Sequence, residues 1–254
     1  MRKSIDFDRV ARWYDLYACA IFDLPFWVEE ARRHPGRGLE LMCGTGRISL
    51  AILGAGIPLT CVDYSAGLLA VFQEKLAQRG LAAEVIEQDV RTLRLAASYD
   101  WAFIGFHAFA ELYDEGDRRA ALQRIAAALV PAGTFSCALH NPAVRGPQLD
   151  GRWHDATPIA VPGGGRLEWR WRSEYDASTG NASGVQAYRE RDAAGRPVAE
   201  VELPIHFHLI APGAFEALVR DGGFEVVSRW GDYDRTPFHT ATSPYFLCEA
   251  RRRA

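Results

Sequence analysis

The chain is organised around one short stretch, Leu39-Glu40-Leu41-Met42-Cys43-Gly44-Thr45-Gly46-Arg47. Apolar residues follow it at helical spacing, so the sequence predicts a strand, a tight glycine turn and then a helix. A turn of this kind directs free backbone N–H groups and the positive end of the helix dipole toward one point. Glycine has no Cβ atom, so a ligand can approach the backbone closely at Gly44 and Gly46. The stretch therefore predicts a ligand site; the alternative is an ordinary βα turn that binds nothing.

The glycine spacing distinguishes two classes of ligand site. A dinucleotide fingerprint, G-x-G-x-x-G, needs a third glycine, and this chain has Ser49 there. The stretch instead resembles motif I of the class I S-adenosylmethionine-dependent methyltransferases, E/D-x-G-x-G-x-G. Glu40, Gly44 and Gly46 match that motif, whereas Met42 stands where the family usually has its first glycine. The resemblance implies S-adenosyl-L-methionine as the cofactor, with Glu40, Gly44 and Gly46 in its site.

A second acidic position follows at the spacing that a nucleotide site requires. Residues 59–62 form a short apolar run that ends at Asp63, and Tyr64 comes next. In nucleotide-binding α/β folds, an acid about twenty residues beyond the glycine turn accepts hydrogen bonds from the ribose hydroxyls. Asp63 is therefore expected at the ribose and Tyr64 against the adenine face. The alternative for Asp63 is a helix cap at a strand end.

A third acidic position completes the resemblance. The predicted strand 83–87 runs into Asp89-Val90. In the methyltransferase family an acid here accepts from the adenine N6 amino group, and the next backbone N–H donates to a ring nitrogen. The resemblance implies these roles for Asp89 and Val90, and it extends over about residues 7–140.

The leading segment, residues 7–31, carries aromatic and apolar residues at steps of three and four, which predicts a helix interrupted near Pro25. In many small-molecule methyltransferases a Tyr-Asp pair lies in this leading helix, which caps the cofactor. The resemblance therefore implies that Tyr14, in Tyr14-Asp15, reaches the methionyl carboxylate. The alternative is a helix that only packs on the core.

Residues at the ends of two later strands are the candidates for chemistry. Strand 99–105 runs out at Phe106-His107, and strand 134–139 ends at His140-Asn141. Ligands bind beyond the carboxyl ends of such strands, so residues 106–111 should face the transferred methyl group. His140 or Asn141 is expected to line the acceptor pocket; the alternative is that Asn141-Pro142 simply ends the strand. The Phe106 carbonyl is expected to take the methionyl ammonium. His107 is a candidate base, since an ordinary imidazole titrates near neutral pH, and His140 is a second candidate. Orienting the substrate is the alternative role for His107.

The alternation of strands and helices stops at residue 143. Between about 150 and 210 the sequence predicts three antiparallel strands, with Leu167, Trp169 and Trp171 on one face of the first. The expected fold class is therefore α/β: a Rossmann-like, seven-stranded, mainly parallel sheet with helices on both faces and an inserted antiparallel β-meander. Residues 1–142 and 211–254 should form the cofactor-binding core, with the last strand antiparallel. Residues 143–210 should either cover the acceptor pocket or pair subunits in a homodimer.

Composition limits the remaining choices. The chain has 254 residues, 48% hydrophobic and 24% charged, with a formal charge of −3. This balance argues against a nucleic-acid partner, and we expect neither a membrane span nor a secretory signal. The five cysteines are odd in number and lack a C-x-x-C pair, which fits a reduced cytoplasmic setting. We predict no metal, because His206 and His208 lack a third ligand of clear spacing.

Together these features predict an enzyme that transfers a methyl group from S-adenosylmethionine to an N or O atom of a small-molecule acceptor. Two alternatives stay open. One is an NAD-dependent oxidoreductase, which the missing third glycine and the acid at Asp89 disfavour. The other is a non-catalytic protein that binds S-adenosylmethionine without turning over an acceptor.

Overall fold

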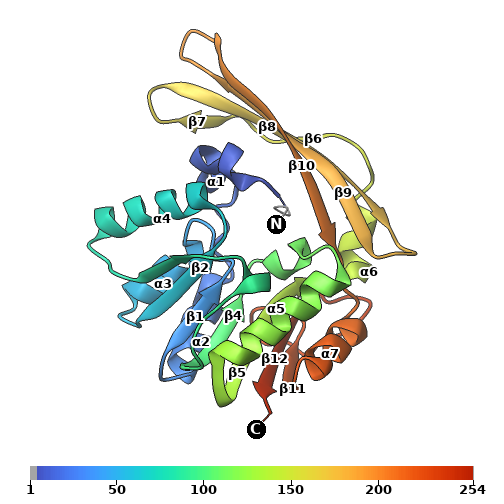
Figure 1. Cartoon of the computed structure of the whole chain (residues 1–254). Helices are drawn as coiled ribbons and strands as arrows, with labels where there is room; N and C mark the ends of the chain where they lie inside the picture. Colours follow the sequence, from blue (N-terminus) through green and yellow to red (C-terminus); the bar gives the residue numbers. More distant parts are fainter. Residues whose placement is uncertain (1–4, 254) are drawn as a thin grey trace.

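The computed structural model describes residues 5–253 and contains two sheets, of seven and five strands (Figure 1). The seven-stranded sheet has the order β11-β12-β5-β4-β1-β2-β3. Its strands are β1 Gly38–Leu41, β2 Leu59–Asp63, β3 Glu84–Glu87, β4 Tyr99–Ile104, β5 Leu129–His140, β11 Phe224–Trp230 and β12 Tyr245–Arg252. Strands β1 to β5 pair in parallel, and β12 is antiparallel to both its neighbours. The predicted sheet, including its antiparallel last strand, is confirmed.

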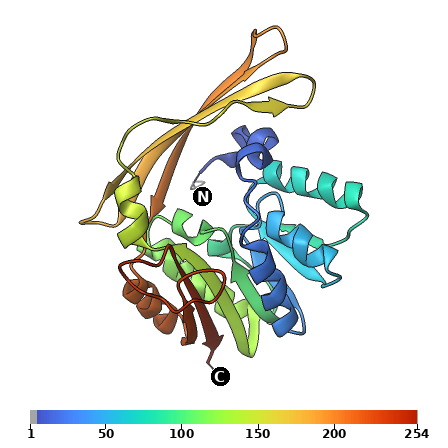
Figure 2. The ribbon, with the colours of Figure 1, turned by 180° about the vertical axis from the view of Figure 1, so that it is seen from behind.

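Helices cover both faces of this sheet (Figures 1 and 2). The α-helices are α1 Ala11–Tyr17, α2 Leu24–Arg33, α3 Arg47–Gly54, α4 Ala66–Arg79, α5 Glu115–Ala128, α6 Pro142–Arg145 and α7 Pro212–Asp221. Short 3-10 helices are η1 Phe7–Arg9, η2 Val90–Thr92, η3 Ala108–Glu111 and η4 Gly146–Gln148. Because strand side chains alternate, Ala102 and Ile104 of β4 pack toward α5 and α7, whereas Trp101 and Phe103 pack toward α2 and α3.

The leading segment differs from the prediction in where it breaks. We expected a helix over residues 7–31 interrupted at Pro25, but the break lies at residues 18–23 and α2 then begins at Leu24. Pro25 falls in the first turn of α2, where proline is tolerated because its missing N–H has no helical partner.

The second sheet is the predicted insert, with more strands than expected. Its strands are β6 His154–Asp155, β7 Ile159–Val161, β8 Gly165–Asp176, β9 Asn181–Arg191 and β10 Pro197–His208. The prediction of three strands was therefore incomplete, since β6 and β7 are too short for an alternating pattern to reveal them. The long strands β8, β9 and β10 arch over the carboxyl edge of the first sheet (Figure 1).

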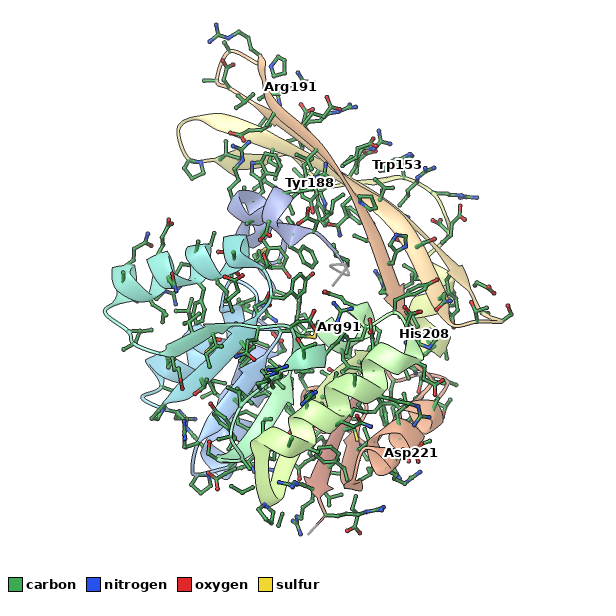
Figure 3. The ribbon with its side chains drawn as sticks, viewed as in Figure 1. Arg91, Trp153, Tyr188, Arg191, His208 and Asp221 are labelled. Atoms are coloured by element: carbon green, nitrogen blue, oxygen red, sulfur yellow. The ribbon has the colours of Figure 1, made fainter. Side chains whose placement is uncertain are left out.

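The underside of the arch packs on the leading segment. Trp13 of α1 stacks on Tyr188 of β9 with ring centroids 5.6 Å apart, and Trp13 Nε1 donates to Glu190 at 2.9 Å. Tyr188 is labelled in Figure 3. Leu167, Leu203 and Tyr188 are fully buried in this contact. The insert and α1 therefore form one cover above the sheet edge.

The order of the strands fixes where a ligand can bind. The chain reverses direction across the sheet between β1 and β4, which are neighbours although β2 and β3 lie between them in sequence. At such a switch point the loops beyond the strand ends diverge and leave a crevice. The glycine turn follows β1 and Phe106-His107 follows β4, so the two predicted segments lie on either side of that crevice.

Candidate functional site

The glycine turn after β1 has two glycines with different surroundings. Gly44 has φ +57°, and a Cβ atom placed there would have only Leu68 and Tyr14 near it, at 3.9 and 4.0 Å. Gly46 has φ +75°, and its Cβ would lie 2.1 Å from the Phe72 ring. Gly44 therefore leaves room for a ligand, whereas Gly46 is required by the packing of α4 against the turn.

Met42 takes the position of the family's first glycine and has a left-handed backbone. Its φ is +57°, a left-handed conformation that costs a non-glycine residue roughly 1–2 kcal/mol. The side chain packs against the core on the α5 side of the sheet, which offsets that cost.

Asp63, at the end of β2, faces the crevice and is held by the backbone. It accepts from the N–H of Gly44 at 2.8 Å and of Ser65 at 2.9 Å. Burial raises the pKa of Asp63 to about 6, although these two donors oppose the rise. Tyr64 lines the same cavity and donates its hydroxyl to the Ile5 carbonyl.

Glu40 is a buried acid beneath the turn. It accepts a short hydrogen bond from the Ser49 hydroxyl. Burial raises its pKa to about 8, opposed by Ser49 and by the charge of Arg47. Glu40 reaches the cavity but is also needed by α3, so its role there is partly structural.

The third acidic residue, Asp89, already has a hydrogen-bond partner within the protein. Asp89 caps η2 and accepts from Arg91 Nε at 2.9 Å, while Arg91 Nη1 reaches Asp117 at 2.7 Å (Figure 3). Burial would raise the pKa of Asp89, but its hydrogen bonds to Arg91 outweigh burial and lower it. Val90 is buried in the core. Neither residue borders the cavity beside Gly44, so their adenine contacts remain predictions.

The leading helix lies over this cavity and is tied down on two sides. Asp15 accepts from the Thr45 hydroxyl at 2.5 Å and pairs with Lys75 of α4 at 2.7 Å. Tyr14, one residue earlier, borders the cavity together with Phe7. The contact of Asp15 with Thr45 is what brings Tyr14 to the glycine turn.

Two consecutive residues at the end of β4 have left-handed backbones, Phe106 at φ +50° and His107 at φ +63°. Such conformations are uncommon in non-glycine residues and cluster at functional sites. Arg47 supports them: its guanidinium lies 4.3 Å from the Phe106 ring centroid and pairs with the buried Asp23. Sequence reasoning missed Arg47, although it stands inside the quoted motif.

The two candidate histidines lie together. The rings of His107 and His140 stack with centroids 3.7 Å apart, and Tyr245 stacks on His107 at 5.0 Å. Burial, then the charges of His140 and Arg145, hold the pKa of His107 well below its usual range. Burial and Arg145 lower the pKa of His140 to about 3. Both imidazoles are therefore neutral near pH 7. Their lowered pKa values make them weak bases, so they take a proton from a hydroxyl poorly.

Glu111, at the end of η3, is the acid that sequence reasoning did not single out. Within residues 5–253 its carboxyl group has no hydrogen bond or ion pair. Burial, with a smaller effect of Asp63, raises the pKa of Glu111 to about 8. The only signal in the sequence was its place a few residues after β4.

A second cavity, of about 370 Å³, lies between the sheet edge and the insert. Apolar residues form one wall and include Phe7, Trp169, Trp171, Ile205 and Phe207. Trp169 and Trp171 stack with centroids 4.5 Å apart. Polar side chains facing the same space come from His107, Glu111, His140, Arg145, Ser173 and Gln186. Phe7 and Glu111 border both cavities, so a donor in the first and an acceptor in the second would meet beside them.

Comparison with known proteins identifies the class. Residues 39–133 match the model of the methyltransferase domain family. The chain also superposes on an S-adenosylmethionine-dependent methyltransferase from Clostridium acetobutylicum, with a TM-score of 0.81 over 98% of this chain and 99% of that one, at 14% identity. Residues 39–133 therefore form a methyltransferase domain, and the chain has the fold of an S-adenosylmethionine-dependent methyltransferase. The predicted fold class is confirmed, and the match over residues 39–133 supports the predicted family and cofactor.

Two curated relatives are similar over part of their length. Cypemycin N-terminal methyltransferase from Streptomyces sp. is 31% identical over 118 residues, 46% of this chain and 47% of that one. Glycine/sarcosine N-methyltransferase from Halorhodospira halochloris is 31% identical over 132 residues, 50% and 49% respectively. The chain thus aligns with about half the length of the relatives it matches.

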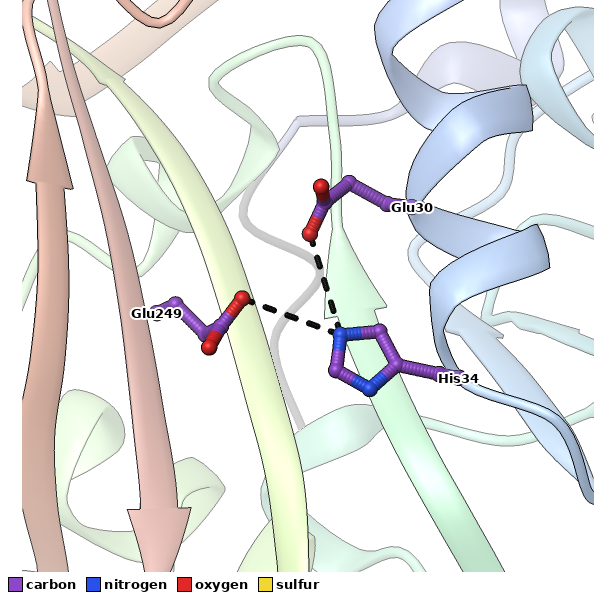
Figure 4. Close-up of side chains that lie close together, drawn as sticks. All are labelled: Glu30, His34 and Glu249. Atoms are coloured by element: carbon purple, nitrogen blue, oxygen red, sulfur yellow. Dashed lines mark ion pairs between the residues drawn. The ribbon is translucent and has the colours of Figure 1, made fainter.

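Other ionisable groups lie apart from the two cavities. His208 Nδ1 contacts the Asn181 side-chain oxygen at 2.8 Å, so this histidine has a partner within the insert. A cluster between α2 and β12 places His34 Nε2 3.7 Å from both Glu30 and Glu249 (Figure 4). These atoms are close enough to share a metal ion, but Arg235 already pairs with Glu30 at 2.5 Å. We therefore interpret the cluster as a set of ion pairs.

This cluster predicts a pH-dependent stability. Burial alone would lower the pKa of His34, but Glu249 and Glu30 outweigh it and raise the pKa to about 9. The charged imidazole therefore stabilises the fold fully below about pH 6.5, the unfolded value, and the effect is lost as pH rises through 9. His34→Gln should cost about 2–3 kcal/mol at pH 6 and much less at pH 10. Urea unfolding at both pH values measures this; an equal cost at both would contradict it.

Proposed function

We propose that this protein transfers a methyl group from S-adenosylmethionine to the nitrogen of a small-molecule amine. The observation that carries the proposal is the Glu111 carboxyl group, which borders both cavities, has no partner within residues 5–253, and has its pKa raised by burial to about 8. The neutral histidines beside it are poor bases for a hydroxyl acceptor. Of the two curated relatives described above, one is an N-methyltransferase and the other an N-terminal methyltransferase by name, which also supports nitrogen as the acceptor atom.

The residues that line the first cavity suit the cofactor. Gly44 leaves space above the backbone, Asp63 offers a carboxylate at the end of β2, and Tyr14 and Tyr64 add aromatic surface. We propose that these residues hold S-adenosylmethionine, with the Phe106 carbonyl at its ammonium. The bound cofactor supplies an electrophilic methyl group on a sulfonium centre.

The chain's own residues supply binding, orientation and one proton transfer. An ionised Glu111 attracts the ammonium form of the acceptor, and its carboxylate then takes the proton that must leave before nitrogen can react. Its raised pKa suits exchange with an amine, because the two proton affinities lie close together. Trp169 and Trp171 contact the acceptor from the other side of the cavity. His107 and His140 line the cavity and do not act as bases. Holding the two reactants in line is the main contribution to the rate.

The role of the insert and the remaining partners belong to the same proposal. Residues 143–210 cover the acceptor cavity, since β8 and β10 contribute Trp169 and Ile205 to its wall. No helix in residues 5–253 has the length and apolar character needed to cross a membrane. We propose a cytoplasmic enzyme whose acceptor is a small molecule rather than nucleic acid. Whether the insert also pairs subunits can be measured by light scattering.

Calorimetry tests the cofactor against the two alternatives. S-adenosylhomocysteine should bind with micromolar affinity, and NAD should not bind. Micromolar binding of NAD alone would support the oxidoreductase alternative instead. Binding of S-adenosylhomocysteine without turnover on any acceptor would support a non-catalytic binding protein.

A single substitution tests the ribose position. Asp63→Ala should weaken S-adenosylhomocysteine binding about ten- to a hundredfold, because a charged hydrogen bond contributes roughly 1.5–3 kcal/mol. Asp100→Ala is the matched control: Asp100 also accepts a backbone N–H, from Arg37 at 2.8 Å, but it begins β4 at the opposite edge of the sheet. If both variants bind S-adenosylhomocysteine with the same affinity, Asp63 does not contact the cofactor. Circular dichroism checks that both variants fold.

A further inference from the structure

The acceptor cavity is bordered by a cation, Arg145, that has no carboxylate partner within residues 5–253. Arg145, the last residue of α6, lines this cavity. Its Nε atom is buried without a hydrogen-bond partner, and Nη1 donates to the side-chain oxygen of Gln148 at 2.8 Å. No acidic group within residues 5–253 pairs with it, and residues 1–4, Met-Arg-Lys-Ser, carry no carboxylate side chain.

Other partly buried arginines of the same core have found partners. Arg47 pairs with Asp23 at 2.5 Å and Arg91 with Asp117 at 2.7 Å. Arg118 donates to two backbone carbonyls, those of Leu112 and Tyr113. Burying a cation without compensation costs free energy, so the unpaired Arg145 is expected to have a partner from outside the chain.

The surroundings of Arg145 favour an anion there. His107 and His140 line the same cavity, and the charge of Arg145 helps burial to lower the pKa of both imidazoles. Ser173 and Gln186 contribute a hydroxyl group and an amide to the same cavity. Glu111 is the one acidic side chain lining this space, and it too lacks a cationic partner within residues 5–253. Among the described residues, the cavity therefore has one cation and one acid that lack a partner of opposite charge.

We propose that Arg145 binds a carboxylate of the acceptor, so that the substrate is an amino carboxylic acid. Its ammonium group lies at Glu111, its carboxylate at Arg145, and an apolar, preferably flat, body lies against Trp169 and Trp171. A guanidinium suits this role because its planar set of donors matches a carboxylate. The inference rests on the proposed N-methylation, since it assigns the second end of the same acceptor.

Paired substrates provide the test. Aromatic amino acids are compared with their carboxamides, which keep the amine and the ring but lose the negative charge. The protein should prefer the acid at least about tenfold in kcat/KM, mainly through KM, in line with one charged hydrogen bond. Arg145→Gln should abolish this preference and Arg145→Lys should keep part of it. Arg152→Gln, a matched loss of charge at a side chain that is 85% exposed, should leave the preference unchanged.

A binding measurement separates this inference from the proposed reaction. Phenylpropionate, which has the carboxylate but no amine to methylate, should change the tryptophan fluorescence of the protein saturably without any methyl donor. The signal should be lost in Arg145→Gln, retained in Arg152→Gln, and absent with phenylpropionamide. Equal binding of acid and amide, or unchanged binding in Arg145→Gln, would overturn the inference. If no amine is methylated, the proposed reaction fails while this measurement still decides the role of Arg145.

Discussion

Glu111→Gln is expected to lower kcat for methylation of an amine about a hundredfold or more, the usual contribution of a general base. The amide keeps the shape of the side chain but neither attracts an ammonium group nor accepts its proton. Because the ionised form is needed, wild-type kcat/KM should rise as pH increases through about 8, and this rise should disappear in the variant. Initial rates over pH 6–10 measure both effects.

Stability should change in the opposite direction, which separates a catalytic loss from misfolding. The pKa of Glu111 is raised to about 8 in the folded protein, so its contribution to stability is complete below the unfolded value and is lost as pH rises through 8. An amide does not ionise, so Glu111→Gln does not lose stability as pH rises. The Tm of the variant should therefore match or exceed the wild-type Tm at pH 9. Glu115→Gln, at an exposed acid paired with Arg119, is the control and should keep its activity. Normal turnover in Glu111→Gln would refute the assigned role.

Gly46→Ala is expected to destabilise the fold by about 2–5 kcal/mol. The left-handed backbone costs alanine roughly 1–2 kcal/mol, and overpacking against the Phe72 ring adds about 1–3 kcal/mol. The Cβ atom would stand 2.1 Å from that ring, so Phe72 or α4 must move. Urea unfolding measures the cost.

Gly44→Ala is the matched comparison, because its backbone is also left-handed but its Cβ has open space. It should cost only about 1–2 kcal/mol in stability. Its affinity for S-adenosylhomocysteine should nevertheless fall at least about tenfold, as expected when a methyl group clashes with a bound ligand. A larger stability loss at Gly44 than at Gly46 would contradict the division between a ligand-facing and a packing glycine.

The fold could be predicted because the sequence patterns that determine it are local and follow one another in order along the chain. The glycine turn, the acid at Asp63 and the strand ending at Phe106 each follow a short apolar run, and parallel strands bring such positions to one edge. The same logic found the antiparallel insert from the alternation around Trp169. It missed β6 and β7, because two or three residues do not make a pattern.

The site was harder to predict from the sequence, because its chemistry depends on which side chains are buried and on which of them lack a partner of opposite charge among residues 5–253. His107 looked like a base by its ordinary pKa, but burial in the folded protein, followed by the charges of His140 and Arg145, lowers that pKa. Glu111 and Arg145 look like ordinary surface charges in the sequence. Only the structure reveals that each lies at a cavity without an opposite charge from residues 5–253.

The most direct test is to follow a labelled methyl group from S-adenosylmethionine into a panel of amines, phenols and carboxylic acids, with the product located by mass spectrometry. We expect label on nitrogen of at least one amine, with one S-adenosylhomocysteine released for each methyl transferred. Label found only on oxygen, or micromolar binding of S-adenosylhomocysteine with no transfer to any acceptor, would contradict the proposal that this protein is an amine N-methyltransferase.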